Sequence, residues 1–238
     1  MTRIVKEYAV RRTEILDAAQ RLVYTKGYEQ MAIQDILDEL QIAKGTFYHY
    51  FDSKQALLEA IVERIYEEIE RLLVPIVQNP QLPFLEKFRR FFDAIGRWKI
   101  EQKSFLLALL RVWYTDDNVL VRQRARAIGT KCIKPLLTTI IHQGIQEGVL
   151  KISYPDQVSG VILWLIQGLQ ETLAELLLSP EREHDLPQLL YHLESTIAAY
   201  TDAFERVLGS PTGSLYLYDP ETLREWVIYQ ETMDKSIP

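Results

Sequence analysis

The chain has 238 residues, of which 47% are hydrophobic and 25% charged, and its formal net charge is −6. This length allows one large or two small domains with a sizeable core. We found no apolar run approaching the roughly eighteen residues of a membrane-spanning helix, and the N-terminus lacks an apolar signal-peptide core. The single cysteine, Cys132, excludes an intrachain disulfide. We therefore expect a cytoplasmic protein that has no membrane partner.

The net charge is unevenly distributed along the chain. The first fifty residues contain as many Lys and Arg as Asp and Glu, so the rest of the chain carries the whole negative charge. Arg3, Lys6 and Arg11 make the N-terminal arm locally basic. Binding to nucleic acid would therefore depend on a small basic face, and the acidic body should not bind DNA non-specifically.

The first predicted helix covers Val10–Lys26. Gly27 follows it and is suited to a left-handed helix cap. The apolar side chains of this segment recur at helical spacing and form one buried stripe, which comprises Ile15, Ala18, Ala19, Leu22 and Val23.

Residues 33–51 predict a helix, a tight turn and a second short helix that starts near Ala43. In the second helix Phe47 and Phe51 face inward, one turn apart. The first helix has the i, i+3, i+4, i+7 spacing of one buried face, at Ile33, Ile36, Leu37 and Leu40. The outward side chains of the second helix can meet phosphates or base edges, and they are Lys44, Thr46, Tyr48 and His49.

Two interpretations fit this helix pair. Short amphipathic pairs are common, and an aromatic cluster of this kind can be the ordinary edge of a core. The alternative is a DNA-binding helix-turn-helix. Gly45 favours it, because the missing side chain allows a duplex to approach the backbone closely.

A longer stretch carries a more specific signal. It runs from Arg12-Thr-Glu-Ile-Leu-Asp-Ala-Ala through Lys26-Gly27-Tyr28 and Lys44-Gly-Thr-Phe-Tyr-His-Tyr-Phe to Ser53-Lys54-Gln-Ala-Leu-Leu. This stretch, residues 12–61, resembles the N-terminal domain of the TetR/AcrR family of transcriptional regulators. The resemblance implies an all-helical homodimer that binds double-stranded operator DNA. It also implies that a small molecule bound by the C-terminal domain usually releases the DNA.

We expect the DNA contacts to come from the helix pair and from the start of the next helix. The expected contact residues are Gln34, Lys44, Gly45, Thr46, Tyr48, His49 and Lys54, with Arg3, Lys6 and Arg11 as additional arm contacts. The chain departs from the family pattern at three positions. It has Ala32 where Thr or Ser is usual, Gln41 where Gly is frequent, and Ala43 in place of Ser. These changes put individual phosphate contacts in doubt.

The next helix is predicted to start after Asp52, a good N-cap, and to end at about Val74, before Pro75 and Asn79-Pro80. Lys54 lies at its N-terminus, where backbone N–H groups and the helix dipole favour an anion such as phosphate. Its predicted inward residues are Leu57, Leu58, Ile61, Ile65, Ile69 and Leu72.

Residues 84–114 predict two helices that are rich in aromatic side chains, and a long helix follows over about Val119–Glu147. The aromatic residues can be plain core or the lining of a ligand pocket, since pockets are mostly apolar. The acidic body slightly favours a neutral or cationic ligand. The expected pocket residues are Tyr66, Phe88, Phe92, Phe105, Trp113 and Trp164.

Two further helices, about Pro155–Leu178 and Leu186–Leu208, have apolar stripes broad enough to face both their own domain and a partner. In the resembling family the corresponding helices pair across a two-fold axis, and burial within one chain is the alternative. The tail 210–238 predicts a short helix over Pro220–Glu231, and its role stays open.

The sequence therefore predicts an all-α protein with a helix-turn-helix domain (1–53), a helical ligand-binding and dimerisation domain (54–209) and a C-terminal extension (210–238). We found no histidine set with metal-ligand spacing, no glycine-rich phosphate loop and no nucleophile elbow. We therefore expect neither enzyme activity nor a cofactor. The predicted function is a repressor that a small hydrophobic or aromatic effector releases from its operator. The rivals are a regulator whose body binds a protein partner, and an enzyme fused to a DNA-binding domain.

Overall fold

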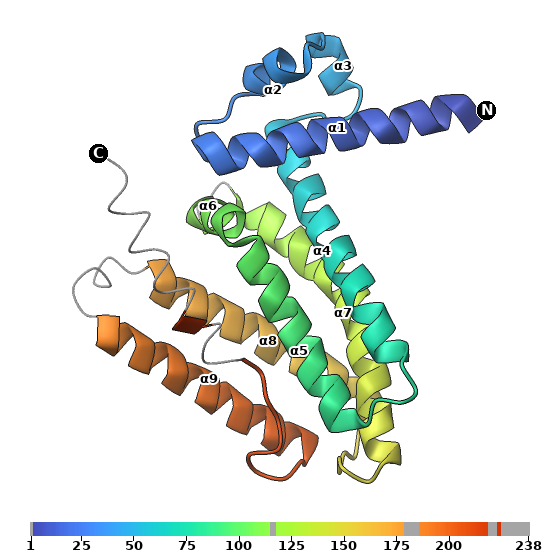
Figure 1. Cartoon of the computed structure of the whole chain (residues 1–238), viewed down its shortest axis with the longest axis vertical. Helices are drawn as coiled ribbons and strands as arrows, with labels where there is room; N and C mark the ends of the chain where they lie inside the picture. Colours follow the sequence, from blue (N-terminus) through green and yellow to red (C-terminus); the bar gives the residue numbers. More distant parts are fainter. Residues whose placement is uncertain (1, 115–117, 179–185, 219–222, 225–238) are drawn as a thin grey trace. The chain divides into compact units, whose positions relative to one another are not determined.

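The computed structural model describes residues 2–114, 118–178, 186–218 and 223–224, and over these residues all regular elements are helices (Figure 1). The all-α prediction is therefore confirmed for the described part of the chain. The contacts divide the chain into two compact units. Unit 1 contains residues 1–67 and 102–128, and unit 2 contains residues 68–101 and 129–238.

Unit 1 is built on α1 (Thr2–Lys26), against which α2 (Ile33–Leu40) and α6 (Lys103–Trp113) pack, while α3 (Lys44–Tyr48) packs on α2. The first helix begins earlier than the predicted Val10, so the basic arm is its opening turns. The buried face predicted for α2 is confirmed, because Ile36 and Leu37 are buried in the core while Ile33 and Leu40 are partly buried against it. The unit 1 core also includes Ile15, Ala18, Ala19, Val23, Phe47, Leu57, Leu58 and Phe105.

α4 (Lys54–Gln78) begins in unit 1 and ends in unit 2. Its N-cap is Ser53 rather than the predicted Asp52, because Ser53 Oγ accepts the N–H of Ala56 at 3.0 Å. In unit 1, the Arg64 guanidinium of α4 donates to Asp17 Oδ1 of α1 at 2.5 Å. This ion pair and a further bond to Gln20 fix the first half of α4 to α1.

The predicted end of α4 at Val74 is wrong, because the helix continues through Pro75 to Gln78. A proline inside a helix removes one N–H donor, and tertiary contacts can offset that loss. Leu72 was predicted to face inward and is 39% exposed, whereas Leu73 and Val77 are buried in its place. In the last turns of α4, the buried face is therefore rotated about the helix axis relative to the predicted face.

In unit 2 a buried polar network holds the last turn of α4. Lys87, which is 3% exposed, donates to the Val77 carbonyl at 2.7 Å and to Gln143 Oε1 at 2.6 Å. Burial lowers the pKa of Lys87 below its ordinary value. Glu147 accepts the Phe84 N–H at 2.8 Å. These bonds join the last turn of α4 to α5 (Phe84–Glu101) and to the end of α7 (Val119–Gln146).

α8 (Pro155–Leu178) and α9 (Leu186–Leu208) lie side by side in unit 2 (Figure 1). Gly168 permits this approach, because a Cβ at that position would lie 2.9 Å from the Tyr200 hydroxyl. Contrary to the sequence prediction, α8 is long and apolar enough to cross a membrane by length and composition, and 33% of its apolar window is buried. One such helix is weak evidence for a membrane, since core helices of soluble proteins meet the same criterion.

The short helix predicted over Pro220–Glu231 lies outside the described residues except for Leu223 and Arg224.

Candidate nucleic-acid interface

The turn between α2 and α3 passes through Gln41, which has φ 52° and ψ 45°. It is the one non-glycine residue with positive φ among those described. The left-handed conformation lets the Ile42 N–H bond to the Leu37 carbonyl at 3.0 Å, which closes the end of α2. The Gln41 side chain also donates to the Asp38 carbonyl at 2.5 Å. At this position, where the TetR pattern often has glycine, the chain has Gln41 in a strained conformation, and the Gln41 side chain adds a hydrogen bond to Asp38.

The start of α2 has no hydroxyl cap, and the carboxylate of Asp35 bonds to the backbone there. Ala32 has no side-chain oxygen, and Asp35 Oδ2 accepts the Ala32 N–H at 2.8 Å. Asp35 Oδ1 also pairs with Lys26 Nζ at 2.7 Å, which links the end of α1 to α2. The hydrogen bond from Lys26 and then the one from Ala32 lower the pKa of the Asp35 carboxyl.

Phe47 sets the orientation of α3. Its side chain is fully buried, and its ring centroid lies 5.8 Å from that of Phe51. Since α3 has five residues, the residues on the side opposite Phe47 must face solvent.

That outer face carries the predicted contact residues. Lys44, Gly45, Tyr48 and His49 are exposed, and Thr46 is half-buried. Lys44 Nζ lies 5.9 Å from the centre of the Tyr48 ring. A Cβ built on Gly45 would meet nothing within 4 Å among the described residues, so the backbone is open to a large partner at this point.

The remaining predicted contacts are engaged within unit 1. Gln34 is exposed, and its amide donates to Asp38 Oδ1 at 2.7 Å. Lys54 donates to the Glu29 carbonyl at 3.1 Å, and its Nζ lies 4.5 Å from the centre of the Tyr28 ring. Burial lowers the pKa of Lys54. The ammonium group has three N–H donors, so one hydrogen bond leaves others for a phosphate.

The predicted arm residues Arg3 and Lys6 lie in the first turns of α1, where the structure describes the backbone alone. Arg11 is further along and pairs with Glu14 at 2.6 Å.

The sequence analysis missed Tyr8. Its ring centroid lies 4.6 Å from that of Tyr50 and 5.7 Å from that of His49, so α1 supports the end of the α3 segment. Tyr8 precedes Ile15 by two helical turns. Extending the apolar stripe of α1 toward the N-terminus would have identified it.

The six predicted ligand residues are divided between the units. Phe105 is buried in the unit 1 core, and Tyr66 and Trp113 pack against it. Phe88 and Phe92 of α5 are buried in unit 2, with ring centroids 4.9 Å apart. Trp164 is 67% exposed on α8. Neither unit alone brings the six together. Within the described residues no group of three or more His, Cys, Asp or Glu could hold a metal ion.

The comparisons with known proteins agree with this geometry. Residues 15–61, which contain α2, α3 and the start of α4, match the family model of bacterial regulatory proteins, tetR family. Over this segment the chain is similar to the TetR family of transcriptional regulators. It is similar to the transcriptional repressor NemR of Escherichia coli strain K12, at 27% identity over 193 residues that cover 79% of this chain and 94% of NemR.

Two further proteins are similar to this chain. An uncharacterised HTH-type regulator of Lactococcus lactis is 47% identical over 103 residues, which cover 41% of this chain and 51% of that protein. A TetR-family regulator of Pectobacterium atrosepticum has a similar fold, with a TM-score of 0.62, 19% identity and coverage of 87% of this chain and 98% of that one. The match of residues 15–61 to bacterial regulatory proteins and the similarity to a named transcriptional repressor support the interpretation of this chain as a transcriptional regulator.

The strain at Gln41 gives a prediction about stability. The Gln41→Gly variant should unfold with a free energy about 0.5–1 kcal/mol higher than wild type. The relief of the left-handed conformation (roughly 1–2 kcal/mol) should exceed the added flexibility of glycine (roughly 0.5–1 kcal/mol). Urea denaturation of the two proteins measures the difference. The Gln41→Val variant is the matched control and should be less stable than wild type, because a β-branched residue tolerates positive φ poorly. A glycine variant no more stable than the valine variant would contradict the assigned turn.

Proposed function

We propose that the protein is a homodimeric repressor that binds operator DNA through α3 and is released by a small hydrophobic or aromatic effector. The observation that carries this proposal is the α3 segment itself, in which full burial of Phe47 leaves Lys44, Gly45, Tyr48 and His49 exposed on the opposite side. An exposed helix with a cation, a phenol, an imidazole and an open glycine suits insertion into a major groove.

The proposed contacts have different tasks. Lys44 and Lys54 supply positive charge for phosphates, and the N-terminus of α4 adds backbone N–H groups. Thr46, Tyr48 and His49 are placed to meet base edges or neighbouring phosphates. Gln34 and the arm residues Arg3, Lys6 and Arg11 would add contacts at the border of the site. We propose residues 1–53 as the part that binds DNA, in the cytoplasm.

The proposed dimer interface is the exposed apolar surface of α8 and α9. Val161 and Trp164 of α8 are 46% and 67% exposed, and Tyr191 of α9 is 68% exposed. Only 33% of the apolar window of α8 is buried, and contiguous exposed apolar surface often marks an interaction site. A two-fold pairing of this surface would cover it and would provide two DNA-binding segments for a palindromic operator.

An effector can release the operator only by binding the DNA-free conformation more tightly than the DNA-bound one. We propose that the helical domain, residues 54–209, takes the effector. Linkage then requires that the DNA complex bind the effector more weakly, by the factor by which the effector weakens DNA binding.

The DNA contacts are tested by Lys44→Ala and Tyr48→Ala. Both should weaken binding to operator DNA without lowering stability, because the two side chains lie on the outer face. Loss of one phosphate contact at Lys44 should also reduce the slope of log affinity against log salt by about one unit. Fluorescence anisotropy with labelled operator over a salt series measures both quantities.

The matched controls are Lys151→Ala and Tyr154→Ala, which remove the same side chains from exposed positions in unit 2. Both controls should bind the operator as wild type does. Wild-type affinity in both α3 variants, with their folding intact, would show that another surface contacts the DNA.

The interface is tested by the double replacement of Val161 and Trp164 with Glu. Four buried carboxylates per dimer would be left without partners, so the variant should sediment as a monomer where wild type sediments as a dimer. Analytical ultracentrifugation measures this difference. The control is Tyr154→Glu, at an exposed site in the loop before α8, and it should leave the dimer intact. A wild-type monomer, or a double variant that stays dimeric, would refute the proposed interface.

A further inference from the structure

The segment after α9, residues 209–218, is fixed to unit 2 by a buried carboxylate. Glu205 in the last turn of α9 is 4% exposed and accepts two backbone N–H groups of this segment. Its Oε2 bonds to Gly213 and its Oε1 to Leu215, each at 2.9 Å. Leu215 and Leu217 are buried beside it. Residues 215–218 are therefore buried or half-buried against unit 2, and this part of the segment can form the wall of a site.

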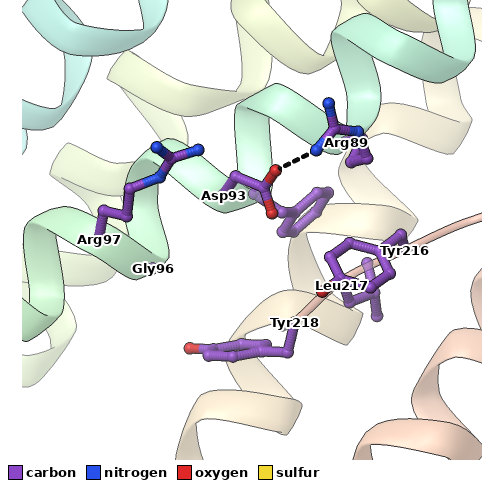
Figure 2. A pocket seen from close by; sticks show the side chains of 8 residues that line it. Arg89, Asp93, Gly96, Arg97, Tyr216, Leu217 and Tyr218 are labelled. Carbon is purple, nitrogen blue, oxygen red and sulfur yellow. Dashed lines mark hydrogen bonds and ion pairs between the residues drawn. The ribbon is translucent and has the colours of Figure 1, made fainter. Parts of the chain in front are cut away.

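The segment and α5 enclose a cavity of about 390 Å³ (Figure 2). Two walls of different chemistry face it. Phe92, Asp93 and Arg97 belong to α5, and the two tyrosines Tyr216 and Tyr218 belong to the segment. The volume falls in the range of small-molecule sites, which combine apolar and aromatic faces with a few placed polar groups. All of the lining residues belong to unit 2.

The charged groups at this cavity differ in how they are engaged. Arg89 pairs with Glu86 and with Asp93, both at 2.9 Å. The hydrogen bond that Arg89 donates to Glu86 raises the pKa of Arg89. Asp93 is thereby neutralised by its own neighbour. Lys99 donates to the Tyr218 hydroxyl at 3.4 Å. Arg97 is exposed and has no ion pair or hydrogen bond with any residue that the structure describes.

The local charge is therefore opposite to that of the whole chain. The cations of α5 are Lys87, Arg89, Arg90, Arg97 and Lys99, and they outnumber the carboxylates Glu86, Asp93 and Glu101. The net charge of −6 favoured a neutral or cationic effector, but the groups beside this cavity favour an anion. In a partly enclosed site the near charges dominate, because distant ones are screened by solvent.

We propose that this cavity is a binding site for a small aromatic carboxylate. The unpaired Arg97 guanidinium can donate two parallel hydrogen bonds to the carboxylate, a geometry that lysine does not offer. The rings of Phe92, Tyr216 and Tyr218 supply flat apolar faces for the aromatic part. An anion without a ring would leave those faces uncovered, and a neutral aromatic compound would leave Arg97 unmatched.

Of the six pocket residues expected from the sequence, this site includes only Phe92. Its other lining residues were not expected. The inference rests on the proposed function only in one respect, that the bound carboxylate acts as the effector. Binding of the carboxylate can be measured without DNA. It also assigns a role to the C-terminal segment, which supplies one wall of the site.

Isothermal titration calorimetry of the full chain with 1-naphthoate tests the site. We expect one saturable site per chain. 1-Naphthamide, which has the ring without the charge, and cyclohexanecarboxylate, which has the charge without the aromatic ring, should each bind at least about tenfold more weakly. Arg97→Gln should weaken naphthoate binding at least about tenfold and leave naphthamide binding unchanged, because the variant removes one charge-assisted pair.

The matched control is Arg90→Gln, on the same helix. Arg90 pairs with Glu86 and does not line the cavity, so this variant should bind naphthoate as wild type does. Arg97 is exposed, so its replacement should leave the melting temperature unchanged. If 1-naphthoate does not bind saturably, or if Arg97→Gln binds naphthoate as wild type does, the proposal is overturned.

A parallel assay of operator binding by the same proteins distinguishes failure of the proposed site from failure of the proposed DNA-binding function. Normal DNA binding without naphthoate binding would overturn this site and leave the regulator intact. Naphthoate binding without DNA binding would support this site and overturn the proposed DNA-binding function.

Discussion

The burial of one side chain, Phe47, is the constraint on which the proposed DNA-binding surface depends. A five-residue helix has too few hydrogen bonds to be stable by itself, so tertiary packing must hold α3 in place. Phe47 packs in the unit 1 core and against Phe51. Fixing this residue fixes the rotation of α3 about its axis, and that rotation decides which side chains a duplex would meet. Lys44 and Tyr48 are exposed as a consequence.

The same unit shows how a chain can lose common family residues and keep the local geometry. Ala32 cannot cap α2 with a hydroxyl, but the Asp35 carboxylate accepts the Ala32 N–H and its pair with Lys26 adds a link to α1. Gln41 adopts the conformation usually left to glycine and adds a hydrogen bond to Asp38. Each backbone hydrogen bond joins residues three positions apart in the sequence, so the ends of α2 keep their shape through local contacts.

The limits of sequence prediction follow from the range of the interactions. The apolar spacing of α2 and the bounds of α8 and α9 were predicted well, because periodicity and helix ends are local properties. The continuation of α4 through Pro75 was missed, and the last turn is held by a residue of another helix, because Lys87 donates to the Val77 carbonyl. The cavity beside Arg97 was missed for a similar reason. Nothing in the local pattern indicates that residues 216–218 pack beside α5.

The central claim is that two copies of this chain bind one DNA site through α3. The most direct measurement is selection of bound duplexes from a random-sequence library with the full-length protein, followed by sequencing. The account predicts enrichment of a palindrome whose half-site centres lie about 34–36 Å apart or a multiple of that distance, since two helices must enter successive major grooves on one side of the duplex. A library that stays random after repeated rounds, or an enriched site without two-fold symmetry, would contradict the account.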